Sequence, residues 1–152
     1  MVARRIARTL MPAVIAVLLA TPGCQGTETS EDAELSDQDH AAALKVANDF
    51  LRAWREQDVQ AGLNLLSDRL RRAHTLTQIE DAVRGHPNVE HSAFTVSAGE
   101  PVGGDRFAFR VGLVFRFTGQ AADRLESSSH RMVMVLNERG NWRVDSFPIP
   151  RD

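Results

Sequence analysis

The sequence contains one cysteine, Cys24, and therefore has no second thiol with which an internal disulfide could form. The folded part of the chain must be held together by packing alone. No internal repeat and no low-complexity stretch occur after residue 39, which excludes a solenoid or repeat array. The remaining length, residues 40–152, is enough for one small domain with one hydrophobic core.

The motifs of common catalytic and metal sites are also missing. The chain has no Gly-x-Ser-x-Gly turn for a serine nucleophile, and no glycine-rich loop with a lysine that would cradle a phosphate. The spacing of His86 and His91, which flank Pro87 and Glu90, matches no His-Glu-x-x-His or Cys/His ligand pattern. We therefore predict no metal site and no bound cofactor.

The sequence lacks an apolar run long enough to cross a membrane. Its longest run covers residues 10–20, about half of the roughly 20 residues that a spanning helix needs. Three arginines precede this run, and the small residues before Cys24 follow it. This order is typical of an export signal with a cleavage site. We predict that residues 1–23 are a signal peptide.

The same segment resembles a bacterial lipoprotein signal, in which the modified cysteine follows Gly or Ala. Gly23 and Cys24 match that motif, whereas Thr21 and Pro22 depart from it. The resemblance implies that Cys24 is lipidated and anchors the protein at the cell membrane or outer membrane, on the periplasmic or extracellular face. Cleavage without lipidation and an uncleaved membrane helix are the alternatives.

The segment that follows, residues 24–39, carries six acidic side chains and no basic one. Such a stretch buries too little apolar surface to fold, so we expect a disordered tether. Without the arginines of the signal, the chain has 15 basic and 20 acidic side chains; without the tether as well, 15 and 14. The near-neutral domain makes nucleic acid an unsuitable partner.

The clearest predicted element is a helix at the start of the domain, capped by Ser36 or Asp37. Its apolar side chains recur at steps of three and four residues, as on one face of a helix: Ala43, Val46, Ala47, Phe50, Leu51 and Trp54. Asp58 is expected to cap a second, short helix that carries Val59, Leu63, Leu66 and Leu70.

A third helix is predicted from a capping box of Thr77 and Glu80, and Gly85 is expected to end it. Beyond it the apolar period changes from 3.6 to 2, which indicates strands. They are predicted at residues 92–98, 106–118, 130–138 and 142–149, with a loop at 99–105 and a polar connection at 119–128. This order predicts an α+β domain, with N-terminal helices packed on one face of a curved antiparallel sheet.

Residues 40–149 resemble the nuclear transport factor two-like family, whose cone-shaped domains include polyketide-cyclase-like and ketosteroid-isomerase-like proteins. The resemblance rests on residues 50–54 (Phe-Leu-Arg-Ala-Trp), 65–67 (Leu-Leu-Ser) and 140–144 (Gly-Asn-Trp-Arg-Val). It implies the cone-like fold. It does not imply one activity, because the fold carries enzymes, binding proteins and scaffolds.

An enzyme of that family is expected to hold a carboxylate or histidine inside the cone. The inward face of strand 106–118 is wholly apolar, which leaves His91 and His130 as weak catalytic candidates. The alternative is that both are partly exposed histidines at element boundaries. Seven apolar side chains are candidates for lining a ligand pocket or forming a packed core: Trp54, Phe107, Phe109, Phe115, Phe117, Met132 and Met134.

Together these features predict an exported, lipid-anchored cell-envelope protein whose domain binds or scaffolds without catalysis. The alternatives are a small isomerase-like or cyclase-like enzyme and a carrier of a hydrophobic ligand in the cone. An open cavity with a buried ionisable group would favour the enzyme, and a filled cone would exclude it. The sequence names no ligand.

The strand at residues 130–138 predicts an association. Residues 132–136 are apolar without alternation, so both faces of the strand are expected to be covered. One solution is a homodimer through the outer sheet face, with Arg106, Arg110 and Arg116 near its rim. The other is a cover formed by residues 148–152 or by the connection at 119–128.

Overall fold

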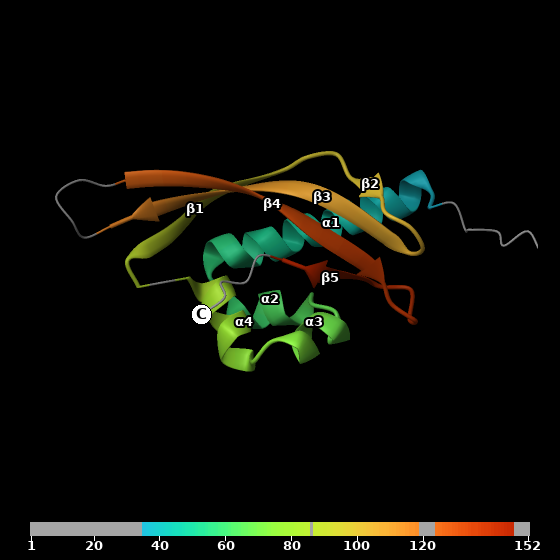
Figure 1. Ribbon diagram of the computed structural model, residues 1–152, viewed down its shortest axis with the longest axis horizontal. Helices are drawn as coiled ribbons and strands as arrows, with labels where there is room; N and C mark the ends of the chain where they lie inside the picture. Colours follow the sequence, from blue (N-terminus) through green and yellow to red (C-terminus); the bar gives the residue numbers. More distant parts are fainter. Residues whose placement is uncertain (1–34, 86, 119–123, 148–152) are drawn as a thin grey trace, which may run out of the picture. The chain divides into compact units, whose positions relative to one another are not determined.

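The computed structural model describes residues 35–85, 87–118 and 124–147. The predicted signal peptide, Cys24 and the acidic segment as far as residue 34 lie outside the described residues, as do the prolines at 148 and 150. In the described part, four helices lie on one side of an antiparallel sheet (Figure 1). None of these helices is both long enough and apolar enough to cross a membrane.

Helix α1 (Asp37–Glu56) is capped at its N-terminus by Ser36, one of the two predicted caps. The Ser36 hydroxyl accepts a hydrogen bond from the Asp39 backbone N–H at 3.2 Å, and the Ser36 backbone N–H donates to the Asp39 carboxylate at 3.0 Å. Acidic side chains are favourable at a helix N-terminus. The last residues that the sequence assigned to the tether, 37–39, therefore belong to the helix.

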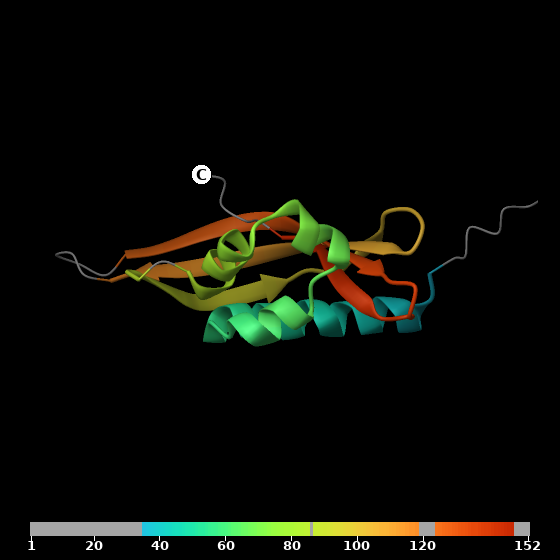
Figure 2. The same cartoon turned by 90° about the horizontal axis from the view of Figure 1, so that it is seen from below.

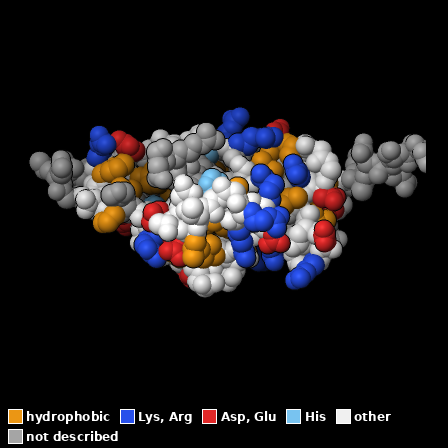
Figure 3. Space-filling view, turned by 60° about the horizontal axis from the view of Figure 1, so that its bottom comes forward, with side chains coloured by type: hydrophobic (Ala, Val, Ile, Leu, Met, Phe, Trp, Pro, Cys, Tyr) orange, Lys and Arg blue, Asp and Glu red, His pale blue; other side chains and the backbone are white. Residues whose placement is uncertain are grey.

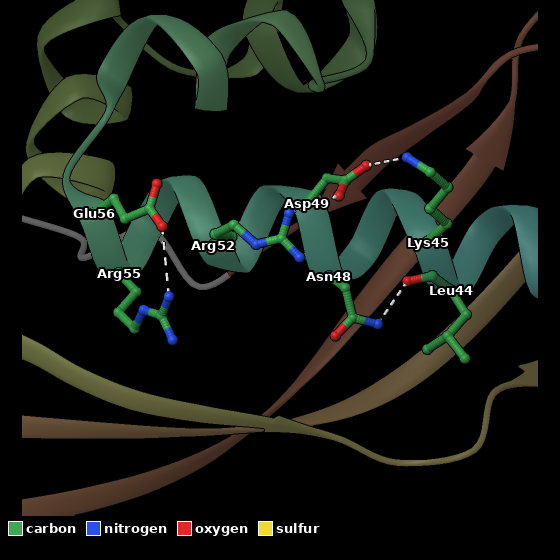
Figure 4. Close-up of polar contacts among 7 residues, drawn as sticks. All are labelled: Leu44, Lys45, Asn48, Asp49, Arg52, Arg55 and Glu56. Atoms are coloured by element: carbon green, nitrogen blue, oxygen red, sulfur yellow. Dashed lines mark hydrogen bonds and ion pairs between the residues drawn. The ribbon is translucent and has the colours of Figure 1, made fainter.

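The two faces of α1 differ as predicted. Its buried residues are Ala43, Ala47, Phe50, Leu51, Ala53 and Trp54. The other face carries polar contacts within the helix (Figure 4): Lys45 Nζ lies 2.6 Å from Asp49 Oδ2, and the Asn48 amide donates to the Leu44 carbonyl at 2.9 Å. The polar side chains of this face thus make contacts within the helix, while the apolar stripe packs against the sheet.

The predicted second helix is in fact two helices, α2 (Val59–Asn64) and α3 (Asp68–Ala73). Asp58 caps α2 as expected. The chain then leaves the helix because Leu66 pairs with Val144 of the sheet, and the Ser67 N–H donates to the Val144 carbonyl at 2.8 Å. Ser67 also caps α3, since its hydroxyl accepts from the Leu70 N–H at 3.0 Å.

Helix α4 (Leu76–Arg84) has a capping box, but not the predicted one. Its N-cap is Thr75, whose hydroxyl accepts from the Gln78 N–H at 3.2 Å while Gln78 Oε1 accepts from the Thr75 N–H at 3.0 Å. The prediction from Thr77 and Glu80 was wrong because Thr75 and Gln78 offer the same spacing one half-turn earlier. The predicted end at Gly85 is confirmed.

The sheet contains β1 (Val89–Val96), β2 (Glu100–Pro101), β3 (Arg106–Phe117), β4 (Arg124–Leu136) and β5 (Trp142–Ser146). The strand order is β1-β3-β4-β5, and β2 also pairs with β3. The segment predicted as a loop thus contains β2, and residues 124–128 of the predicted polar connection belong to β4. Strand β4 begins six residues earlier than expected because its polar half pairs with β3 residue by residue, from Arg124 opposite Phe117 onward.

This arrangement confirms the predicted α+β class and the packing of helices on one sheet face. Viewed from below, α1 runs along the strands, and α3 and α4 lie in front of the sheet (Figure 2). The main core forms where α1 meets the inner faces of β3, β4 and β5, with Phe50, Leu51, Phe109, Met132 and Val144 fully buried. The helices therefore fix which end of the sheet is filled.

Candidate functional site

The inner face of the β3–β4 pair changes character along its length. Strand β3 presents only apolar side chains: Phe107, Phe109, Val111, Leu113, Phe115 and Phe117. Their partners on β4 run from apolar to polar: Met134, Met132, His130, Ser128, Glu126 and Arg124. The apolar half is packed. The half in which aromatic side chains face polar ones is open.

A cavity of about 860 Å³ occupies this open half. Its apolar wall includes Trp54, Leu113, Phe115, Phe117 and Phe147. Sites for small molecules typically have volumes of about 300–1,000 Å³ and apolar walls with a few polar groups. The size and the wall of this cavity therefore suit a small ligand.

His91 is the buried ionisable group of the cavity, with an exposed fraction of 4%. Its ring stacks on the Trp54 indole, with ring centroids 4.0 Å apart and an interplanar angle of 9°. Its Nδ1 lies 2.7 Å from the Trp54 carbonyl oxygen. Because a carbonyl can only accept, Nδ1 carries the proton, and Nε2 of the neutral ring has the free lone pair.

Burial lowers the pKa of His91, and the hydrogen bond to the Trp54 carbonyl offsets this effect only in part. The imidazole is therefore neutral near pH 7. Among the described residues, Nε2 has no hydrogen-bond partner. A neutral, oriented imidazole of this kind can accept a hydrogen bond or a proton from a ligand.

Gly85 allows α4 to end against this imidazole. A Cβ atom at Gly85 would lie 2.4 Å from His91 Nε2, and the residue has φ +75°. Both features favour glycine, since other residues would clash there and be strained in the left-handed region. The glycine that ends α4 thus also allows the backbone to approach Nε2 of His91.

Other polar groups of the cavity come from α4 and β4. Gln78 and Asp81 lie on α4, while Glu126, Ser128 and His130 lie on β4. His130 Nε2 is 2.8 Å from the Ser128 hydroxyl. Glu126 pairs with Arg124 at 2.6 Å, so its charge is partly compensated. These groups give the cavity a polar lining beside its aromatic wall.

The candidate site residues predicted from the sequence fall into two groups, one that lines the cavity and one that lies in the packed core. Trp54, Phe115, Phe117, His91 and His130 line the cavity. Phe107, Phe109, Met132 and Met134 lie in the packed core, each at most 3% exposed. Cys24 lies outside the described residues. Among the described residues, no group of three or more His, Cys, Asp or Glu side chains could hold a metal ion.

Sequence reasoning missed the polar side of the cavity. The sequence places Ser128 and Glu126 in a polar connection, because the run Ser127-Ser128-Ser129 has no apolar alternation. Gln78 and Asp81 lie within the helix that the sequence predicts, but the helical pattern alone does not show that they line a cavity. One feature of the sequence could have predicted the early start of β4. The inner face of β3 is apolar over the whole strand, which favours a neighbouring strand of the same length.

A second buried polar cluster lies outside the cavity lining. The Asp145 carboxylate, 2% exposed, accepts from the Ser67 hydroxyl at 2.6 Å and from Arg69 Nε at 2.9 Å. Burial raises the pKa of Asp145, but the hydrogen bonds from Arg69 and Ser67 outweigh burial, so the net pKa is lowered. All groups of the cluster are satisfied by one another. We assign it a structural role, the attachment of α3 to β5.

Solved structures show which fold this is. A ketosteroid isomerase-like protein from Erwinia carotovora atroseptica superposes with a TM-score of 0.54 at 12% identity, covering 72% of this chain and 92% of that one. An NTF2-like protein with a cystatin-like fold from Novosphingobium aromaticivorans gives 0.50 at 14% identity, covering 70% and 77%.

A protein of unknown function from Mycobacterium tuberculosis gives a TM-score of 0.50 at 13% identity, covering 68% of this chain and 66% of that one. No protein-family model matches the chain, and no curated protein matches it significantly. At these identities the likeness concerns the fold alone. The domain has the nuclear transport factor two-like α+β fold.

Proposed function

We propose that this protein is an exported, lipid-anchored cell-envelope protein whose domain binds a small, mostly apolar molecule beside His91. The cavity is the observation that carries the binding proposal, because it has a volume of about 860 Å³ and is lined by both aromatic side chains and polar groups. The fold is compatible with this role, because fold relatives can differ widely in activity.

The polar groups suggest how the ligand lies. Its apolar body would contact Phe115, Phe117 and Phe147, which line the cavity. A hydroxyl or amine on the ligand would donate to Nε2 of His91, because Nδ1 already donates to the Trp54 carbonyl. A ligand that ends in an acceptor alone would leave Nε2 unsatisfied and would bind less tightly.

Binding can be tested with the fluorescent apolar probe N-phenyl-1-naphthylamine and two matched variants. Ser128 lies on the inner face opposite Leu113, whereas Ser129 lies on the outer face opposite Gly112. Ser128→Phe should fill the cavity and weaken probe binding at least about tenfold, while Ser129→Phe should leave binding unchanged. Equal binding by both variants and the wild type would refute the proposal.

The anchor is supported by the order of basic, apolar and small residues before Cys24. A single acyl chain holds a protein only marginally at a membrane, so stable anchoring requires more than one chain. Cells that express the wild type or Cys24→Ala should differ in fractionation, with the variant released from the membrane fraction. The same distribution for both proteins would rule out the anchor.

Catalysis is the second candidate, because His91 is the buried ionisable group that an enzyme of this fold would use. Its neutral Nε2 could take a proton from a ligand as a general base. The test is isomerisation of a β,γ-unsaturated ketosteroid to the conjugated ketone, followed by ultraviolet absorbance. Turnover that is lost in His91→Gln would establish an enzyme, and probe binding without turnover would leave a binding protein.

A homodimer through the outer sheet face stays a prediction. Met132 and Met134 point inward and are buried, which leaves Val133 and Val135, both partly exposed, on the outer face. Light scattering of the wild type and of Val133→Glu gives the mass directly. A dimer that Val133→Glu dissociates would support this interface, and a wild-type monomer at high micromolar concentration would exclude it.

A further inference from the structure

The domain is nearly neutral, but its arginines are unevenly placed. Figure 3 shows Lys and Arg side chains gathered over one part of the helical side, in the region of α3 and β5. On the outer face of the sheet, Arg110 and Arg131 are exposed and project away from the helices. The domain therefore has regions of positive potential on its surface, although its net charge is close to zero.

Arg110 and Arg131 are direct cross-strand neighbours on β3 and β4. Side chains in this relation have Cβ atoms only about 4.5–5.5 Å apart, and like charges so placed destabilise a sheet. Among the described residues Arg110 takes part in no ion pair. Arg131 has one ion pair, with Glu100 at 3.9 Å, and both side chains are mostly exposed, so it contributes little.

Both arginines border a depression of about 410 Å³ on the outer face. Ala98 and Ala108 are small residues of its lining, and Ser97 and Ser129 bring hydroxyl groups to it. The exposed Glu100 carboxylate, the ion-pair partner of Arg131, also lines it and would have to turn away from a bound anion. The Ser97 hydroxyl accepts from the Arg110 N–H and donates to the Arg110 carbonyl, each at 3.1 Å. These two bonds fix the backbone from which the Arg110 guanidinium projects.

We propose that Arg110 and Arg131 together bind a phosphate-type oxyanion in this depression, with the Ser129 hydroxyl as a further donor. The planar guanidinium fork matches the oxygen spacing of phosphate, and two forks can hold one such group from both sides. The negative charge of a bound oxyanion would also reduce the repulsion between the two arginines. The oxyanion could come from a soluble phosphate ester or from the headgroup of an anionic phospholipid.

The first test measures the melting temperature of the full chain with and without inorganic phosphate, at constant ionic strength. Phosphate should raise the melting temperature of the wild type in a saturable way. Arg110→Gln and Arg131→Gln should weaken this binding at least about tenfold. Arg139→Gln, in the exposed turn after β4, is the control and should behave like the wild type.

If the arginines instead stabilised the fold, their replacement would lower the melting temperature even without phosphate. Without phosphate, Arg110→Gln should be at least as stable as the wild type, because it removes a like-charge neighbour. Phosphate can also stabilise proteins in general by exclusion from their surface. An equal rise in the wild type, both arginine variants and Arg139→Gln would show only that general effect and would overturn the proposal.

The second test identifies the source of the oxyanion. Dihexanoyl phosphatidylglycerol, kept below its micelle concentration, is compared with inorganic phosphate and with dihexanoyl phosphatidylcholine. A stronger effect of the phosphatidylglycerol assigns the site to a headgroup, and an equal or weaker one assigns it to a soluble phosphate. Ser129→Phe should block either ligand, whereas Ser128→Phe should block neither. An effect that does not depend on Arg110 would refute the site.

Discussion

The two ends of the β3–β4 inner face have the same backbone and different interiors. At one end Phe107 and Phe109 face Met134 and Met132, and all four side chains are buried. At the other end Phe115 and Phe117 face Glu126 and Arg124, and the space in front of them is a cavity. The inner face of β3 is equally apolar along its whole length, so the difference comes from its partners on β4 and from the elements that cover each end.

This comparison shows that the apolar pattern of a strand identifies a face that must be buried. The pattern does not show which helix, strand or ligand buries it. The packed end is covered by α1, whose apolar stripe contacts the inner faces of the strands. The open end is bordered by α4 and by Gly85, which lies against His91. A ligand could supply the contacts that protein side chains supply at the packed end.

The largest expected effect is that of Trp54→Ala. Trp54 is 1% exposed, belongs to the main core and also lines the cavity, where it stacks on His91. Its loss should lower the free energy of unfolding by about 3–5 kcal/mol, because it leaves a void between α1 and β1. Chemical denaturation measures the change. An unfolding midpoint equal to that of the wild type would show that Trp54 does not link the two regions.

Phe109→Ala and Phe117→Ala test the difference between the ends. Phe109 is fully buried, so its truncation should cost about 3–5 kcal/mol. Phe117 is only partly buried, beneath the Arg124 guanidinium 5.1 Å from its ring, so truncation should cost about 1 kcal/mol. The same denaturation assay compares both with the wild type. Equal costs would contradict the view that one end is packed and the other open.

The smallest expected effect is the pH dependence that His91 causes. Its pKa in the folded chain is below the ordinary value of 6.5, so the unfolded chain binds the proton more readily. The free energy of unfolding should therefore decrease as the pH falls below about 6.5. Denaturation curves of the wild type and His91→Gln measure this slope, which the variant should lack between about pH 6.5 and pH 5.

Asp145 contributes in a separate range of pH. Its lowered pKa means that its stabilising bonds to Arg69 and Ser67 are complete above the ordinary value of 3.8 and are lost as the pH falls through the folded-state pKa. The result that would contradict this account is a free energy of unfolding that begins to decrease only below about pH 4 in the wild type and in the same way in His91→Gln. His91 would then not be the buried neutral group described here.

Most of the packed end could be predicted from the sequence, because its signals are local. The stripe from Ala43 to Trp54 and the alternation from Phe107 to Phe117 each define one buried face. Gly140, between the last two predicted strands, has φ +71°, a conformation that glycine adopts readily in a turn.

The open end could not be predicted in the same way, because its signals depend on distant partners. The polar half of β4 is a strand only because β3 offers it hydrogen bonds, so its own sequence has the character of a loop. The orientation of His91 depends on the carbonyl of Trp54, 37 residues earlier in the chain. Which helix borders the cavity depends on the break at Ser67, where sheet pairing overrides the helical pattern.

The most direct test of the account uses the two tryptophans, one at each end. Trp54 lines the cavity, whereas Trp142 is 4% exposed and packs against Phe107 with ring centroids 5.4 Å apart. Bromobenzene, an apolar molecule whose heavy atom quenches tryptophan on contact, should saturably quench Trp54 in Trp142→Phe and leave Trp142 in Trp54→Phe bright. Equal quenching of both, or saturable quenching of neither, would contradict an open cavity beside His91.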